Sequence, residues 1–189
     1  MSTITVRDAK LEDAARILEI YAYYVEHTVI SFEWDVPSLE EFENRMRDIM
    51  KKYPYLVIER DGKIEGYAYA HAFVGRAAYD WSSELTIYLD SNARKGGLGR
   101  RLYEELADRL KKMGILNLYA CIGYPQVEDE YLTKNSAEFH AHLGFELVGT
   151  FHNCGYKFDR WYDMVWMEKI IGEPHAGQPA VKPYSEVKE

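Results

Sequence analysis

A glycine-rich turn between a short apolar segment and a long amphipathic one most restricts what this chain can fold into. Residues 84–89 have the composition of a strand, and residues 94–101 follow with glycines set among basic side chains. Leucines at helical spacing then run from Leu98 to Leu110. The start of a helix exposes backbone N–H groups, and the helix dipole adds positive potential there. The segment therefore predicts a strand, a turn that binds a pyrophosphate, and a helix.

The spacing of the glycines separates the classes of pyrophosphate ligand. The turn has no Gly-Lys-Ser/Thr, which excludes a nucleotide-hydrolysing P-loop, and Leu102 stands where a dinucleotide fingerprint has its third glycine. The pattern that does match is Arg-x-x-Gly-x-Gly, formed by Arg94, Gly97 and Gly99. This pattern resembles the acetyl-CoA loop of the GNAT acyltransferase superfamily.

A second segment resembles the same superfamily. Residues 135–145 are similar to its last helix, which ends in a Gly-Phe pair, here Gly144 and Phe145. Finer similarities narrow the resemblance to the phosphinothricin acetyltransferase branch; they lie in residues 4–24, 28–32, 76–79 and 155–163. The resemblance covers roughly residues 3–170 and implies acetyl-CoA as cosubstrate, no metal, and a homodimer joined through the late strands. The chain departs from the branch at Thr133, where family members often have Asn, and in the acidic insertion 125–132.

The remaining patterns predict the order β-α-α-β-β-β-α-β-α-β-β, a single α/β domain over residues 1–171. Ser38 and Glu41 read as a capping box at the start of a helix, and Asp61-Gly62 predicts a hairpin. With the resemblance, we expect a GNAT-like fold, a mixed, mostly antiparallel sheet flanked by helices. Prolines and scattered charge in residues 172–189 predict a loosely ordered tail.

Composition limits the partners and the cellular compartment that we expect for this chain. Among its 189 residues 47% are hydrophobic, enough for a core, and the net charge of −8 argues against binding nucleic acid through phosphate contacts. No window approaches the roughly 20 apolar residues of a membrane helix, and the N-terminus lacks the apolar run of a signal peptide. Two cysteines cannot form a disulfide framework, and no Cys/His pair has zinc spacing. We expect a cytoplasmic protein without a membrane partner.

The resemblance assigns two catalytic roles. An amine is mostly protonated at neutral pH, so a base must remove a proton before it can attack a thioester. Glu84 aligns with the proposed catalytic carboxylate of the branch. His140 takes the position of the proton donor to the leaving CoA thiolate, and as a neutral imidazole it could instead be the base. A backbone N–H of Tyr88 or Leu89 is the family-like donor to the oxyanion.

The remaining candidates bind the two substrates. For acetyl-CoA they are Ile87, Tyr88, Leu89, Arg94, Lys95, Gly96, Gly97, Leu98, Gly99, Arg100, Asn135 and Ser136. For the acceptor they are Phe32, Glu33, Arg76, Tyr79, Lys157 and Trp161, with Arg76 suited to grip a carboxylate. Cys121 is expected in the core rather than as a nucleophile.

The acceptor itself stays open between several classes. The favoured one is a small amino acid or an analogue such as phosphinothricin or methionine sulfoximine. The acidic residues 33–48 would instead suit a cationic amine, either a polyamine or a protein N-terminus. A non-catalytic acyl-CoA sensor is the alternative outside enzymes.

Overall fold

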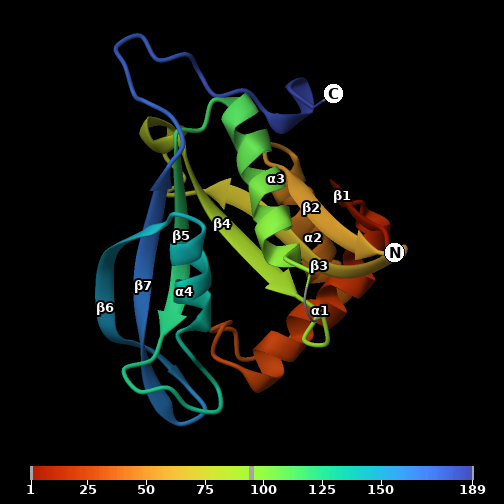
Figure 1. Cartoon of the computed structure of the whole chain (residues 1–189), viewed down its shortest axis with the longest axis vertical. Coiled ribbons are helices and arrows are strands. Elements are labelled where there is room, and N and C mark those ends of the chain that lie inside the picture. The colour runs from red at the N-terminus through yellow and green to blue at the C-terminus, as the bar shows by residue number, and fades with distance from the viewer. Residues whose placement is uncertain (1, 94–95, 189) are drawn as a thin grey trace.

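The computed structural model describes residues 2–93 and 96–188, and within them seven strands form one sheet (Figure 1). Their order across the sheet is β1-β2-β3-β4-β5-β7-β6. Neighbours are antiparallel except β4 and β5, so the expected mixed, mostly antiparallel sheet is confirmed. The strands are β1 (Ile4–Asp8), β2 (Tyr55–Arg60), β3 (Lys63–Ala72), β4 (Ser82–Leu89), β5 (Asn117–Tyr124), β6 (Glu146–Lys157) and β7 (Arg160–Ile170).

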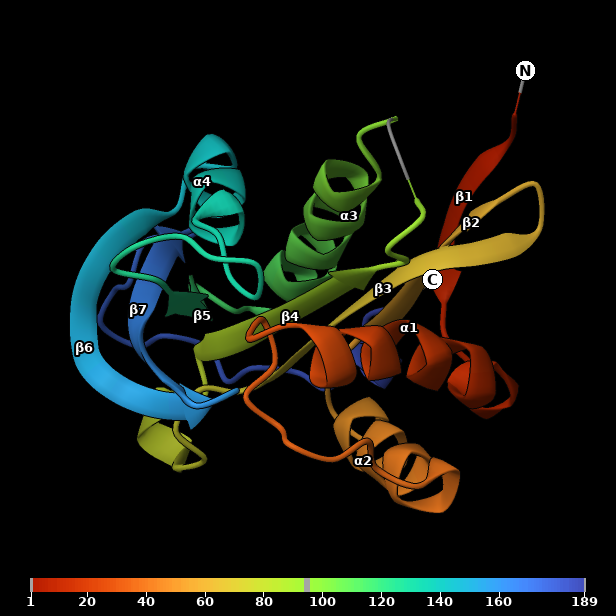
Figure 2. The same ribbon diagram turned by 90° about the horizontal axis from the view of Figure 1, so that it is seen from below.

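Helices cover both faces of this sheet (Figure 2). On one face lie α1 (Ala14–His27) and α2 (Leu39–Met50), and on the other lie α3 (Leu98–Met113) and α4 (Asn135–His142). Leu102, Leu106 and Leu110 of α3 are fully buried against the sheet, as their spacing predicted. None of the helices in the described part of the chain is long and apolar enough to cross a membrane.

Two tight hairpins set the lengths of the strands. Asp61 and Gly62 have φ angles of 51° and 80°, which confirms the predicted hairpin between β2 and β3. Phe158 and Asp159 also have positive φ angles, 52° and 58°, and join β6 to β7. The apolar pattern of the sequence predicts shorter strands here, residues 145–151 and 164–170. It misses the rest of β6 and β7 because the turn between them carries no Gly, Asn-Gly or Asp-Gly signal.

The parallel strands β4 and β5 pair only at their beginnings. Residues 82–84 are in register with residues 117–119, and no pairing is formed between the described residues beyond them. From there β4 and β5 diverge, β4 toward the start of α3 and β5 toward the segment before α4 (Figure 1). Backbone groups of β4 past Glu84 that point toward β5 therefore lack a strand partner on that side.

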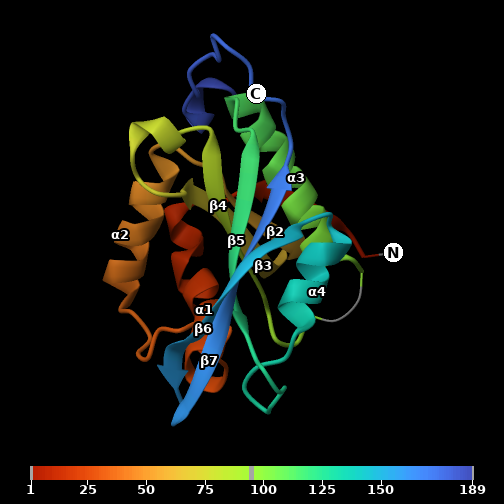
Figure 3. The same cartoon turned by 90° about the vertical axis from the view of Figure 1, so that its left-hand side faces the viewer.

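The tail, expected to be loosely ordered, makes specific contacts with the rest of the chain. Trp81 donates a hydrogen bond from Nε1 to the carbonyl of Pro179, at 2.8 Å. The hydroxyl of Tyr184 donates to Asp8 on β1 at 2.9 Å and accepts from Nε of Arg109 on α3 at 2.8 Å. Val181 also packs against the core beside the C-terminal end of α3, which the tail passes (Figure 3). Prolines here fix an extended path over the surface rather than leaving it free.

Candidate active site

A cavity of about 80 Å³ opens where β4 and β5 diverge. We call it the β4–β5 cavity. It brings together residues that lie far apart in the sequence, from β4, β5, α3, α4 and the segment after α1. Its lining is Ile30, Glu84, Leu85, Thr86, Ile87, Tyr88, Tyr103, Ala120, Cys121, Ile122, Gly123, Ser136 and His140.

This cavity is reached from both faces of the sheet. Side chains alternate between the two faces along a strand. On β4, Leu85 is buried in the core beneath α3, whereas Tyr88 packs edge-on against Tyr21 of α1. Glu84 has the same parity as Tyr88 and faces α1 and α2, while His140 comes from α4 on the opposite face. The cavity therefore lies between a carboxylate on one face and an imidazole on the other.

The carboxylate of Glu84 is half-buried and lies beside one imidazole. Burial raises its pKa, because the charged form loses solvation, and the nearby His71 partly offsets this by lowering it. Nε2 of His71 is 3.8 Å from Oε2 of Glu84. A carboxylate whose pKa is moved toward neutrality can accept a proton from an amine and release it again.

His140 is held in one tautomer by its two ring nitrogens. Nδ1 lies 2.7 Å from the carbonyl oxygen of Ser136, which can only accept, so Nδ1 carries the hydrogen. Nε2 then accepts from the hydroxyl of Tyr103, at 3.0 Å. Burial lowers the pKa of His140, which keeps the ring neutral. In this state Nε2 of His140 has no proton to give.

The predicted pyrophosphate turn begins α3 as expected. Gly97 is the N-cap residue, with a φ of 65° that favours glycine, and no side chain of the described residues caps the helix. A Cβ at Gly97 would meet nothing within 4 Å, so the turn is open to a ligand on that side. The adjoining cavity, of about 330 Å³, is lined by Leu89, Ala93, Gly97, Leu98, Gly99, Arg100, Phe139, His142 and Leu143. Arg94 and Lys95 lie outside the described residues.

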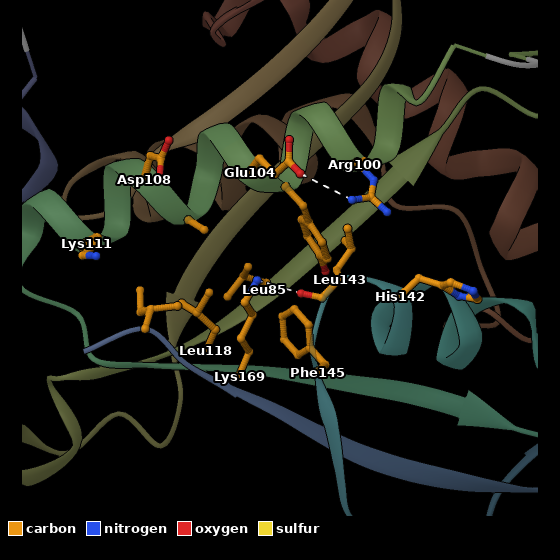
Figure 4. A pocket seen from close by; sticks show the side chains of 13 residues that line it. Leu85, Arg100, Glu104, Asp108, Lys111, Leu118, His142, Leu143, Phe145 and Lys169 are labelled. Atoms are coloured by element: carbon orange, nitrogen blue, oxygen red, sulfur yellow. Dashed lines mark hydrogen bonds and ion pairs between the residues drawn. The ribbon is translucent and has the colours of Figure 1, made fainter. Parts of the chain in front are cut away.

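A larger groove of about 530 Å³ runs along α3 (Figure 4). It shares Arg100 and His142 with the cavity at the glycine turn, and Leu85 and Tyr103 with the β4–β5 cavity. Charged side chains of α3 line its rim and apolar side chains line its floor, as Figure 4 shows for Glu104 and for Phe145. Through these shared lining residues the three hollows adjoin one another, from the start of α3 to the β4–β5 cavity.

On the acceptor face, the segment after α1 closes one side of the cavity. Phe32 lies between two glycines of neighbouring strands: a Cβ at Gly123 would come within 3.2 Å of its ring and one at Gly155 within 2.1 Å. Glu33 accepts hydrogen bonds from Tyr21 and Arg45, and the Arg45 guanidinium contributes to a lowered pKa of that carboxyl, against the opposing effect of burial. Glu33 is therefore a paired carboxylate beside the cavity.

Lys157 was expected to contact the acceptor, but in the structure its ammonium group is bonded within the protein. Its side chain is 3% exposed, and its ammonium group donates to the carbonyls of Val25, Thr28 and Ser31 at 2.7, 2.9 and 2.8 Å. All three ammonium hydrogens are thus used within the protein. Lys157 anchors the segment that carries Phe32 and Glu33.

The other acceptor candidates are on the surface. Arg76 and Tyr79 are exposed in the segment between β3 and β4. Trp161 is 62% exposed at the start of β7, with its ring tilted by 50° against that of Tyr156. The lining of the β4–β5 cavity, as far as the structure describes it, includes none of the three. On the other side, Ser136 reaches the cavity, whereas Asn135 is exposed at the start of α4.

Known proteins similar in sequence to this chain agree with the function that this geometry suggests. Residues 6–166 match the family described as "Acetyltransferase (GNAT) domain". The chain belongs to the GNAT acetyltransferase family. It is therefore an acetyl-CoA-dependent acyltransferase, as the glycine turn and the Gly144–Phe145 pair predicted.

Relatives of this GNAT chain match it over nearly its whole length. The phosphinothricin N-acetyltransferase of Streptomyces viridochromogenes is 29% identical over 97% of the chain and 96% of its own length. The L-methionine sulfoximine/L-methionine sulfone acetyltransferase of Salmonella typhimurium is 30% identical, with 94% and 99% covered. A crystal structure of a phosphinothricin acetyltransferase from Sinorhizobium meliloti in complex with acetyl-CoA has a TM-score of 0.85, 35% identity, and 96% and 98% coverage.

Three features of this GNAT site were not predicted. His71 and Tyr103 were not among the candidates, because the register of β3 against β4 and the face of α3 that meets α4 depend on tertiary packing. Cys121 was expected in the core, yet it is exposed and lines the β4–β5 cavity. Although the residue as a whole is exposed, the partial burial of its thiol and the Glu84 carboxylate raise the pKa of the thiol to about 12, which leaves it protonated and a poor nucleophile.

Proposed function

We propose that this enzyme moves the acetyl group of acetyl-CoA onto the amine of a small amino acid or an analogue, such as phosphinothricin or methionine sulfoximine. The observation that supports this proposal is the β4–β5 cavity, which has Glu84 on one face of the sheet and, on the other, the adjoining hollows toward the glycine turn. Two substrates that approach from opposite faces can meet there without either crossing the sheet. The substrates in the names of the relatives support this acceptor class.

The cosubstrate is held mainly by backbone. The uncapped start of α3 presents N–H groups to the pyrophosphate, and the glycine conformation of the turn keeps side chains out of its way. Arg100 of α3 and Ser136 of α4 line the hollows in which the cosubstrate would lie. The diverging edge of β4, at Ile87, Tyr88 and Leu89, has no strand partner on the side of β5, so backbone N–H groups on that side can bind the pantetheine arm and the thioester oxygen.

Glu84 is the base in this proposal. It takes a proton from the acceptor ammonium, directly or through one water, and its raised pKa suits that exchange near neutral pH. The freed nitrogen lone pair then attacks the thioester carbonyl. A C–N bond forms, the C–S bond breaks with its electron pair on sulfur, and the nitrogen loses its second proton to water to give the neutral amide. No covalent bond to the enzyme is needed, because the site holds the two reactants together.

His140 acts through Tyr103 in this proposal. Its Nε2 accepts the Tyr103 hydrogen, so it orients the hydroxyl at the wall of the β4–β5 cavity rather than donating a proton itself. A thiolate can leave without a proton because the ordinary thiol pKa is about 8.5. His140 and Tyr103 therefore shape the side of the cavity where the leaving group departs.

The experiment that tests this function is acetyl-CoA turnover over a panel of amines. We expect amino acids and their sulfoximine or phosphinate analogues to be acetylated with the highest kcat/KM. If the enzyme prefers polyamines or peptides with free N-termini, the proposed acceptor class is wrong. Binding of acetyl-CoA without turnover on any amine would identify a sensor instead of an enzyme.

We also propose a homodimer formed through the late strands, and a cytoplasmic location. Leu147, Val148 and Phe151 are each more than half exposed on β6, the edge strand of the sheet, which supports a partner copy there. Both cysteines are free thiols, in keeping with a reducing compartment. Light scattering on the purified chain tests the first proposal, and fractionation of cells tests the second.

A further inference from the structure

His71 lies directly opposite Glu84 on the neighbouring strand. In the antiparallel register of β3 and β4 the two residues are partners, so both side chains project from the acceptor face. Nε2 of His71 is 3.8 Å from Oε2 of Glu84. The His71 side chain is 37% exposed and that of Glu84 is 21% exposed, so the imidazole is the more accessible of the two to solvent.

The tautomer of His71 suits it to take a proton from Glu84. Nδ1 lies 3.1 Å from the carbonyl oxygen of Ala72, which can only accept, so Nδ1 carries the hydrogen. Nε2 is then the nitrogen with a free lone pair, and it is the atom that faces the carboxyl group. The gap exceeds a direct hydrogen bond, so one bridging water or a small rotation completes the contact.

Other titratable groups near the pair do not offer this path. Tyr69 on β3, Tyr119 and Cys121 on β5, and Tyr103 on α3 have raised pKa values through burial and stay protonated near neutral pH. His140 on α4 has a lowered pKa and contacts Tyr103. Farther out, Glu33 is paired with Arg45 at 2.8 Å, and Glu168 lies near Tyr119. Among the described residues, His71 is the one proton acceptor that bridges Glu84 and solvent.

We propose that His71 carries to solvent the proton that Glu84 takes from the acceptor amine; this rests on the proposed role of Glu84. After attack, the O–H bond of the protonated Glu84 breaks and the proton moves to Nε2 of His71. The resulting imidazolium releases a proton to water, which restores the Glu84 carboxylate for the next turnover. While charged, the imidazolium also lowers the pKa of Glu84. His71 is thus a positioning and relay residue, not one that contacts the reacting atoms.

His71→Gln tests the relay, because glutamine keeps a polar group near Glu84 but cannot take a proton. We expect kcat to fall by about tenfold, less than the 10²–10⁴ of losing the base itself, with the KM for acetyl-CoA unchanged. Added imidazole buffer should restore kcat in proportion to its concentration. The acid limb of kcat/KM should move to higher pH, because Glu84 loses the neighbouring positive charge. His27→Gln is the matched control: its Nε2 is 3.9 Å from Oε2 of Glu26 on the exposed surface of α1, and it should behave as wild type.

Glu84→Gln, measured in parallel, separates the two ideas. A slow Glu84→Gln enzyme that imidazole does not restore, beside a His71→Gln enzyme that it does restore, supports both roles. If Glu84→Gln is slow but His71→Gln keeps its rate, or loses it without rescue by imidazole, the relay is overturned and the base remains. If Glu84→Gln has the wild-type rate, the proposed base is wrong and the relay falls with it.

Discussion

The hydroxyl of Tyr103 lies 3.0 Å from Nε2 of His140, and both side chains are buried where α3 meets α4. Because the other ring nitrogen donates to the Ser136 carbonyl, this hydrogen bond fixes a neutral imidazole at the cavity wall. A neutral buried histidine has a lowered pKa, so the folded chain binds a proton there less readily than the unfolded chain. The stability that the neutral His140 contributes to the fold is present above the ordinary histidine pKa of about 6.5 and is lost as the pH falls below that value.

Tyr103→Phe keeps the ring and deletes the hydroxyl, which leaves Nε2 of His140 buried without its donor. We expect the free energy of unfolding to fall by about 1–3 kcal/mol, the cost of an unsatisfied buried group. Urea denaturation measures it, with Tyr23→Phe on the exposed face of α1 as the control. Steady-state kinetics should show a lower kcat with little change in the KM for acetyl-CoA. Unchanged stability and rate would mean that the hydrogen bond contributes nothing.

Glu84→Gln should lower kcat by about 10²–10⁴, the usual loss when a general base is removed. Raising the pH should restore part of the rate, since more acceptor amine is then already neutral. The same change should stabilise the fold at neutral pH. Burial raises the pKa of Glu84, so its stabilising effect is present below its ordinary pKa and is lost as the pH rises through the higher folded value. Thermal denaturation near pH 7 and pH 4 tests this expectation, because the stability that Glu84→Gln gains over the wild type should be smaller at the lower pH.

Gly97→Ala should raise the KM for acetyl-CoA steeply. The added Cβ contacts no protein atom, so it projects into the open side of the turn where the pyrophosphate is expected. The positive φ adds strain of about 1–2 kcal/mol. Gly62→Ala provides a strain-matched control, with a φ of 80° and equally open surroundings at the β2–β3 hairpin. Equal KM values in the two variants would remove the turn from the cosubstrate site.

Lys157→Met should destabilise the protein and weaken acceptor binding together. Three backbone carbonyls lose a charged donor, and hydrogen bonds to charged groups contribute about 1.5–3 kcal/mol each, so the loss should be at least about 2 kcal/mol. The segment with Phe32 and Glu33 should then move more freely and raise the acceptor KM. Chemical denaturation and acceptor titrations measure the two effects. An acceptor KM that stays at the wild-type value would separate this anchor from the acceptor site.

Arg76→Ala should weaken binding of a carboxylate-bearing acceptor by about 1.5–3 kcal/mol and spare acetyl-CoA. Arg76 is exposed at the strand ends from which His71 and Glu84 project, outside the cavity lining. Comparing an amino acid with its decarboxylated amine in both enzymes isolates the effect on the carboxylate. Equal losses for the two acceptors, or no loss, would assign Arg76 another role.

Local patterns predicted most of the fold. Helical leucine spacing located α3, Ser38 capped α2 by accepting from the Glu41 N–H, and Asp61-Gly62 set the hairpin between β2 and β3. What the sequence could not supply was which side chains meet across elements. Lys157 was assigned to the acceptor from the family resemblance of residues 155–163, whereas folding places three distant carbonyls around it. His71 pairs with Glu84 because of the register of β3 against β4, and the loop between these strands gives no sequence signal that predicts this register.

The contacts of Tyr184 with Asp8 and Arg109 join the last residues of the chain to its first strand. On a ribosome, Asp8 of β1 emerges 176 residues before Tyr184, so β1 must wait for that whole stretch before its contacts on this side are complete. Contacts between residues so far apart in the sequence slow folding, because the entropic cost of closing the loop comes before the packing contacts stabilise the chain. A nascent chain stalled before Tyr184 should therefore remain more susceptible to proteases at the β1 end than the released protein.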